Sequence, residues 1–325
     1  MPRLLPGRQF PLGNSDPRWA VVRFRLEAHV ASYRRVIFLL RLLARLPLPV
    51  LHGMGIALGW LIYWSPGRHA ARMRHNLFVS GVCSPERDCR RLLRQAIAEV
   101  GKAVIELLPI WLRPYEQVLK LVKGTSGWEG IDAARAAGKG VILLSPHIGC
   151  FEIISLYCAA RYPFTAMYKP PRHALIARLM LAGRQRGQAR LVPTDLSGVR
   201  AQLAALKRHE AIGVLPDQVP SAGEGAWAPF FNRPAYTQTL VSRLQQKTGA
   251  AAFFVAAERL SWGRGYHLHV IPLDGPLPDD KTDATTRINR KMETIIRRFP
   301  AQYLWSYNRY KRPAGTLGPG NPDLA

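Results

Sequence analysis

The stretch KGVILLSPHIGCFEIISLY, residues 139–157, decides the fold of this chain. Its first part, from Gly140 to Leu144, is a short run of apolar or small residues, typical of a strand buried on both faces. Ser145-Pro146 ends the strand, because proline cannot donate a ladder hydrogen bond. Phe151 to Tyr157 has the apolar density of a helix. The stretch therefore predicts a strand, a loop and a helix in succession.

The loop of this unit carries a histidine, and the predicted helix carries a glutamate in its first turn. His147 follows the strand, Gly149 allows a tight turn, and Glu152 comes five residues after the histidine. Ligands of open α/β sheets bind at the carboxyl ends of the strands, so we expect His147 at a ligand site. The two side chains can converge there, with the carboxylate orienting an imidazole that takes a proton from an alcohol.

General-base chemistry on a hydroxyl needs no serine nucleophile, and the chain contains no G-x-S-x-G motif. The alternative interpretation is a surface histidine beside an ordinary first-turn glutamate. The pair alone leaves both interpretations open, and the downstream motifs favour the first.

The composition is that of a globular protein with an unusual charge. The chain has 325 residues, 46 Lys and Arg against 21 Asp and Glu, and a net charge of +25. Such a surface favours anionic partners: nucleic acid, anionic lipid, a phosphorylated substrate or an acidic protein. The spacing of the four cysteines predicts neither a structural zinc site nor a disulfide framework, and a reducing compartment is compatible with it. The cysteines are Cys83, Cys89, Cys150 and Cys158.

The N-terminal part of the chain is predicted to be a flexible terminus, residues 1–20, followed by a membrane-associating helical leader, residues 21–75. Leu46 to Trp64 contains nineteen residues without a formal charge, long enough for a short span or an interfacial helix. Flanking arginines suit anionic headgroups. Gly55 and Gly59 form a G-x-x-x-G pattern that favours close helix packing over nucleotide binding. A buried core helix of a soluble protein is the alternative.

Strands and helices alternate from about residue 139 to residue 300, which predicts an α/β fold. We expect one domain over residues 76–313 and a flexible tail over residues 314–325. A helix beginning near Ser84-Pro85-Glu86 precedes the alternation and runs to about Leu112. Further strands are predicted at 164–168, 189–192, 211–215, 251–256 and 266–271. Further helices are predicted at 173–183, 197–208, 237–249 and 282–299, with Ser197 and Thr237 as caps.

Polar and basic side chains gather after these strands. Lys169 follows the second predicted strand, and Asp217-Gln218 follows Pro216 at the end of the strand at 211–215. Residues 169–208 contain nine basic residues and one acidic residue. Ordinary charged faces are mixed, so this stretch, which includes Arg184, indicates an anion-binding wall beside the loop of His147.

Four motifs together resemble the bacterial lipid A biosynthesis acyltransferase family, the late acyltransferases of the lauroyl or myristoyl type. The first is H-x-x-x-x-E, His147 to Glu152, and the second is Y-K-P at residues 168–170, followed by the Arg-rich segment at Arg184. The third is LPDQVPSAGEGAWAPFFNRPAYT, residues 215–237, and is the most specific. The fourth is W-x-x-N-R-Y-K-R-P at residues 305–313. The resemblance covers about residues 30–313.

The resemblance implies a glycerolipid-acyltransferase-like mixed sheet flanked by helices, at the cytoplasmic face of a bacterial inner membrane. It implies acyl transfer from acyl–acyl carrier protein to a hydroxyl of an acyl chain on a lipid A precursor, with no metal and no cofactor. His147 would be the general base and Glu152 its partner. The residues expected to bind substrate are Lys169, Arg184, Asp217 and Gln218. Backbone amides near Gly149, or a nearby arginine, are candidate donors to the oxyanion.

Two rival functions stay open. A lysophospholipid or an amino-acid lipid could replace the lipid A precursor as acceptor without a change in the reaction. A basic nucleic-acid-binding protein is the rival from another class, but the chain shows no helix-turn-helix, zinc-finger or RNP-like pattern. Nucleic-acid binding also gives no reason for the apolar stretch at residues 46–64.

Overall fold

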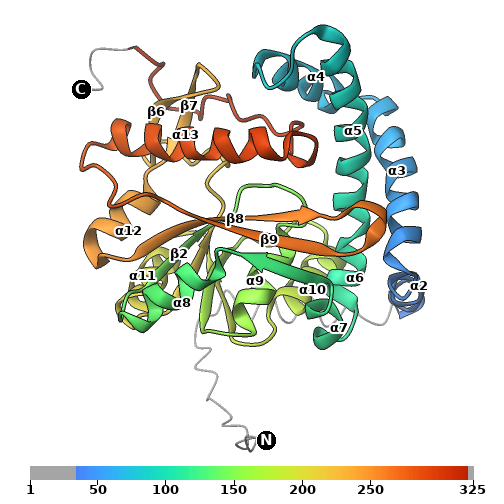
Figure 1. Ribbon diagram of the computed structural model, residues 1–325, viewed down its shortest axis with the longest axis horizontal. Helices are drawn as coiled ribbons and strands as arrows, with labels where there is room; N and C mark the ends of the chain where they lie inside the picture. The colour runs from blue at the N-terminus through green and yellow to red at the C-terminus, as the bar shows by residue number, and fades with distance from the viewer. Residues whose placement is uncertain (1–33, 321–325) are drawn as a thin grey trace, which may run out of the picture.

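The computed structural model describes residues 34–320, so the predicted terminus at 1–20 and parts of the predicted leader and tail lie outside the described residues. The centre of the fold is a seven-stranded mixed sheet in the order β1-β9-β8-β2-β5-β3-β4 (Figure 1). The strands are β1 Val122–Ser126, β2 Val141–Leu144, β3 Phe164–Tyr168, β4 Ala189–Pro193, β5 Ala211–Val214, β8 Ala251–Arg259 and β9 Tyr266–Pro272.

The strand pairings confirm a largely parallel sheet. β2 pairs in parallel with both β5 and β8, and β3 pairs in parallel with β4 and β5. β9 runs antiparallel to β8 and parallel to β1, which makes the sheet mixed. The carboxyl ends of β8, β2, β5, β3 and β4 therefore share one edge, and the loop of His147 leaves the sheet at that edge.

β2 shows why an all-apolar strand lies at the centre. All four of its residues are buried. Ile142 and Leu144 belong to the core formed with helices α5 Glu86–Ile105, α12 Leu240–Thr248 and α13 Lys281–Arg298. Val141 and Leu143 face the other core, formed with α6 Leu107–Leu112, α8 Trp128–Ala136 and α9 Glu152–Ala159. Successive strand side chains point to opposite faces, so helices on both sides require an apolar residue at every position.

The remaining helices are short or peripheral: α2 Arg34–Ala44, α3 Leu48–Trp64, α4 His69–Val79, α7 Tyr115–Leu119, α10 Ala174–Arg184 and α11 Leu196–Lys207. Figure 1 shows α13 above the sheet, α8, α9 and α10 below it, and α3 and α5 standing along one side. Short 3-10 turns lie at Ser261–Gly263 and Pro300–Gln302. The fold confirms the predicted α/β class, whereas a specific likeness to glycerolipid acyltransferases stays a prediction.

Several local predictions need correction. The predicted loop before Thr237 forms a hairpin, β6 Gly225–Phe230 with β7 Arg233–Gln238, and Thr237 lies in β7. The next helix begins after Thr239. Helix α11 is capped by Asp195, which accepts hydrogen bonds from the amides of Ser197 and Gly198. The helix expected to reach Leu112 breaks at Glu106.

One pair of cysteines is bonded, although the spacing of the cysteines predicts no disulfide framework. Cys83 and Cys89 form a disulfide that joins the loop before α5 to its first turn. Their six-residue separation fits no metal motif, and residue spacing alone does not show that the loop returns to the helix. Cys150 and Cys158 are free and buried.

The leader packs on the domain as the glycine pattern predicted. A β-carbon at Gly59 would lie 2.2 Å from the carbonyl oxygen of Ile97, and one at Gly101 would lie 1.9 Å from that of Gly55. Helices α3 and α5 thus touch backbone to backbone. Within residues 34–320, no helix taken alone has the length and apolar composition of a membrane span. Helices α2 and α3 taken together have the length and apolar composition of a membrane span, but their axes are bent by 114° at the break between them.

Candidate active site

A tight loop places the histidine after β2. The amide of Ser145 still donates to Val214 on β5 at 2.9 Å, and the amide of Ile148 folds back to Pro146 at 2.6 Å. Gly149 has φ of +58°, and a β-carbon there would lie 1.9 Å from the carbonyl oxygen of Ala257. Glycine is therefore required for the loop to turn against β8.

The loop is fixed from two further sides. The amide of Gly149 donates to Gln302 at 3.0 Å, and the amide of Cys150 donates to Ala257 on β8, also at 3.0 Å. The carbonyl oxygen of His147 accepts from the amide of Leu304 at 3.1 Å. The backbone around His147 is thus held between the end of β8 and residues 302–304.

The carboxylate that pairs with His147 is Asp217. Its Oδ1 lies 2.9 Å from the imidazole Nδ1, and its Oδ2 accepts from the His147 amide at 2.9 Å. Leu144 and Val214 are register partners in adjacent parallel strands, so residues three positions beyond each strand emerge side by side. Asp217 is only 2% exposed. We expected Asp217 to bind substrate; the structure makes it the partner of His147.

This pairing defines the roles of the two ring nitrogens. A carboxylate at Nδ1 requires a proton there, which leaves Nε2 as an acceptor. The amide nitrogen of Gln218, an exposed residue, lies 3.4 Å from His147 Nε2. Nε2 is therefore the nitrogen that can take a proton from another molecule.

A buried arginine stands behind the pair. Arg309 donates to the carbonyl oxygen of Tyr236 at 2.9 Å and to the hydroxyl of Thr237 at 2.6 Å. Burial alone raises the pKa of a carboxyl, but attraction to His147, the two hydrogen bonds from it and the charge of Arg309 hold the pKa of Asp217 below its usual value. Asp217 is thus kept ionised. Sequence reasoning did not single out Arg309, although it lies in the W-x-x-N-R-Y-K-R-P motif.

Glu152 has a different partner from the one expected. Its carboxylate accepts from the indole of Trp111 at 2.9 Å and pairs with both Nε and Nη2 of Arg184, the second at 2.7 Å. Glu152 lies in the first turn of α9, as the sequence predicted, and the structure adds that it is buried. The separate expectation that Glu152 orients His147 is wrong, because Asp217 accepts hydrogen bonds from both Nδ1 and the backbone amide of His147. Glu152 instead ties α9 to α10 and α6.

Arg184 is held by the same contact. Burial lowers the pKa of a guanidinium, but the Glu152 carboxylate more than offsets this and raises the pKa of Arg184. Its side chain is still 21% exposed. The prediction that it also contacts substrate stays a prediction. Lys169 is exposed directly after β3, two strands from β2, and its substrate role likewise stays a prediction.

The candidate oxyanion donors are already engaged. The amides of residues 147–150 donate to Asp217, Pro146, Gln302 and Ala257 in turn, and Arg184 pairs with Glu152.

The thiol of Cys150, next to this loop, is not a nucleophile. Burial raises the pKa of Cys150 well above its usual value, so the thiol stays protonated at neutral pH.

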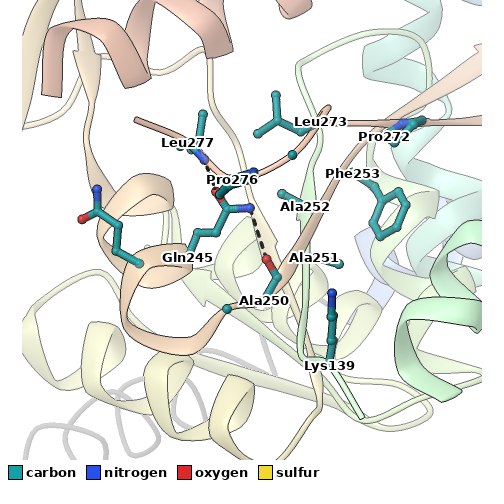
Figure 2. Close-up of a pocket in the computed structure, with 13 residues that line it drawn as sticks. Lys139, Gln245, Ala250, Ala251, Ala252, Phe253, Pro272, Leu273, Pro276 and Leu277 are labelled. Carbon is teal, nitrogen blue, oxygen red and sulfur yellow. Dashed lines mark hydrogen bonds between the residues drawn. The ribbon is translucent and has the colours of Figure 1, made fainter. Parts of the chain in front are cut away.

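A hollow at the opposite edge of the sheet is separate from this site. Lys139 and Ala250 to Phe253, at the amino ends of β2 and β8, line it together with Pro272, Leu273, Gly275, Pro276 and Leu277 (Figure 2). Gln245 spans it, accepting from the amide of Leu277 at 2.8 Å and donating to Ala250 at 3.2 Å. His147 and Asp217 meet at the carboxyl edge, which is therefore the candidate site.

The comparison with known families is decisive for this chain. The model of the family described as bacterial lipid A biosynthesis acyltransferase matches residues 24–312. The chain belongs to this family. It is therefore an acyltransferase of lipid A biosynthesis.

Individual relatives agree with the family. The chain is similar to the lipid A biosynthesis palmitoleoyltransferase of Escherichia coli strain K12, with 28% identity over 83% of this chain and 88% of the relative. It is 27% identical to the lauroyltransferase of the same strain, over 86% and 91% of the two chains. A lipid A biosynthesis acyltransferase of Haemophilus influenzae is 27% identical over 82% and 86%. Two of these relatives are named for different acyl groups, palmitoleoyl and lauroyl.

Proposed function

We propose that this acyltransferase moves a fatty acyl chain from acyl–acyl carrier protein to a hydroxyl of an acyl chain on a lipid A precursor, with His147 as the general base. The observation that carries the proposal is the His147–Asp217 pair at the carboxyl edge of the sheet, with Nε2 left as an acceptor. An imidazole oriented at Nδ1 by a buried carboxylate is the arrangement that removes a proton from an alcohol.

The step balances without a further reactant. Nε2 of His147 takes the proton of the acceptor hydroxyl as its oxygen forms a bond to the thioester carbonyl carbon. Collapse of the tetrahedral intermediate breaks the carbon–sulfur bond, and the departing thiolate takes the proton from the imidazolium. Asp217 stabilises the imidazolium between these events. A thioester is already activated, so the transfer uses no metal and no redox cofactor.

The surface charge supports the choice of partners. Both proposed substrates are anionic, since the carrier protein is acidic and the acceptor is a phosphorylated glycolipid. The chain carries a net charge of +25, and residues 169–208 hold nine basic residues against one acidic residue. We propose Lys169 and Gln218 as substrate contacts, because both are exposed at the carboxyl edge. We also propose the cytoplasmic face of the bacterial inner membrane as the location.

Purified protein tests this proposal directly. It is incubated with acyl–acyl carrier protein and, in parallel, with a lipid A precursor or a lysophospholipid, and products are followed by mass spectrometry. We expect the mass of one acyl chain to be added to the lipid A precursor alone, and His147→Ala to abolish the product. Acylation of the lysophospholipid alone would replace the acceptor in the proposal, and turnover by a folded His147→Ala protein would remove the general base.

A further inference from the structure

The tip of the β8–β9 hairpin carries a tryptophan that contributes little to the core. Trp262 is 87% exposed, the highest exposure of any large apolar side chain within residues 34–320. It adopts φ of +60°, a left-handed conformation that is strained for a residue other than glycine. Arg264 braces the turn by donating to the hydroxyl of Ser261 at 3.0 Å. A strained and exposed tryptophan on a braced turn indicates a contact with something outside the described chain.

The hairpin tip lies against the place where α2 and α3 meet. A β-carbon at Gly263 would be 2.5 Å from the backbone nitrogen of Pro49, so the tip and the first turn of α3 touch. Figure 1 shows the hairpin tip beside α3, with α2 at the lower end of that helix. The outer faces of α2 and α3 expose Val36, Phe38, Leu39, Leu42, Val50, Met54, Ile56, Leu61 and Trp64. We call these residues and Trp262 the apolar side face.

The charges around the apolar side face have one sign. Residues 34–64 and 260–265 contain no acidic residue. Their arginines are all exposed: Arg34, Arg35, Arg41, Arg45 and Arg264. A large exposed apolar patch marks an interaction site, and a tryptophan with arginines around apolar side chains suits a boundary between hydrocarbon and anionic headgroups.

We propose that the β8–β9 tip is a second membrane anchor, which inserts Trp262 at the surface of an anionic bilayer while α2 and α3 lie in the same interface. This inference rests on the proposed function, because it takes the acceptor to be a membrane lipid. β8 and β2 run parallel, so their carboxyl ends share one edge. A bilayer that holds the end of β8 therefore lies at the edge that carries His147, and the acceptor hydroxyl reaches Nε2 without leaving the membrane.

Vesicle binding of the full chain tests the anchor. Trp262→Ala is compared with Leu317→Ala, another exposed apolar residue at 47%, which lies next to the β6–β7 hairpin on the far side of the molecule from α3 (Figure 1). On phosphatidylglycerol-rich vesicles we expect Trp262→Ala to lower the binding constant by about tenfold, equal to about 1.4 kcal/mol, and Leu317→Ala to leave it unchanged. Arg264→Gln should weaken binding to these vesicles and not to neutral phosphatidylcholine vesicles. Equal vesicle binding by wild type and folded Trp262→Ala would overturn the inference.

Activity in two settings separates this inference from the proposed function. With acceptor in detergent micelles, Trp262→Ala should turn over like wild type, and with acceptor in vesicles it should be slower. An equal loss of turnover by Trp262→Ala in both settings would overturn the anchor. So would a variant that binds vesicles like wild type but binds the acidic carrier protein more weakly. Failure of wild type to acylate a lipid A precursor in either setting contradicts the proposed function, while the vesicle-binding difference still supports the anchor.

Discussion

At the scale of single residues, the site depends on two carboxylates with separate tasks. Asp217 contacts both the ring and the amide of His147, whereas Glu152 contacts Trp111 and Arg184. The first carboxylate can act on proton transfer, and the second can act on the packing of α9 against α10. Substitution of each by its amide therefore has a different expected effect.

Asp217→Asn should reduce kcat by about 10³- to 10⁴-fold with KM little changed, because the amide cannot stabilise the imidazolium or hold its tautomer. Glu152→Gln is the matched control: it should retain a larger share of kcat and lose mainly stability. Steady-state kinetics and thermal unfolding of both variants check this. The reverse pattern, with Glu152→Gln the more severe in kcat and Asp217→Asn nearly neutral, would return Glu152 to the role that the sequence suggested.

The Glu152–Arg184 pair is open to a double-mutant cycle. Removing one partner of a buried ion pair leaves an uncompensated charge, so Arg184→Met should lower the free energy of unfolding by about 3–5 kcal/mol. The double variant Glu152→Gln/Arg184→Met should be more stable than Arg184→Met alone. Urea unfolding measures both. Simple additivity of the two single changes would mean that the residues are not coupled.

Sequence reasoning reached most of these residues but paired them wrongly. It placed His147 on the loop, Glu152 in the first helical turn and Asp217 at a strand end. The partner lies 70 residues away in the chain, and its proximity depends on β5 being the neighbour of β2. Strand order is set by long-range packing, which residue spacing does not encode, so a carboxylate five residues away was favoured.

At the scale of elements, the contact of α3 with α5 depends on three glycines, Gly55, Gly59 and Gly101. Gly59→Ala would put a methyl group 2.2 Å from a backbone oxygen, so the helices must separate. We expect a loss of about 1–3 kcal/mol in the free energy of unfolding. Gly53→Ala on the same helix meets nothing within 4 Å and should be neutral or stabilising by up to about 1 kcal/mol. Chemical denaturation of the pair checks this, and equal effects would contradict close packing.

The elements found from sequence are those with a uniform pattern. β2, β3, β5, β8 and β9 are apolar runs between clear turn residues, and all were predicted. β1, with sequence VKGTS, and the β6–β7 hairpin were missed, because their burial is irregular and glycines, prolines and polar residues interrupt their apolar residues. The G-x-x-x-G pattern predicted helix packing correctly, because close approach requires glycine at specific positions.

At the scale of the whole molecule, a buried ionic cluster joins the leader side to the sheet. Arg259 at the end of β8 donates from Nε to Glu106 at 2.9 Å, and Tyr266 on β9 donates to the same carboxylate at 3.0 Å. Glu106 stands at the break between α5 and α6, and His52 of α3 lies 3.5 Å from it. The Glu106 carboxylate thus connects α3, the break between α5 and α6, and the strands β8 and β9.

This cluster makes stability depend on pH. Burial opposes ionisation, but Arg259 outweighs it and lowers the pKa of Glu106 from 4.5 to about 2. A folded-state pKa below the unfolded value stabilises the protein above pH 4.5, by roughly 3 kcal/mol, and this stabilisation is lost as the pH falls from about 5 to about 2. Urea midpoints measured across this range should fall steeply for wild type and less steeply for Glu106→Gln. Parallel slopes would contradict the assignment.

The central claim concerns His147 acting on a lipid A precursor, and the most direct measurement is the mass spectrum of lipid A from cells. A strain lacking this gene and any redundant enzyme is complemented with wild type, His147→Ala or Leu317→Ala, with equal protein levels. We expect wild type and Leu317→Ala to restore one secondary acyl chain, whose mass identifies it, and His147→Ala to leave lipid A one chain short. Full acylation by folded His147→Ala, or lipid A unchanged by loss of the gene, would contradict the account.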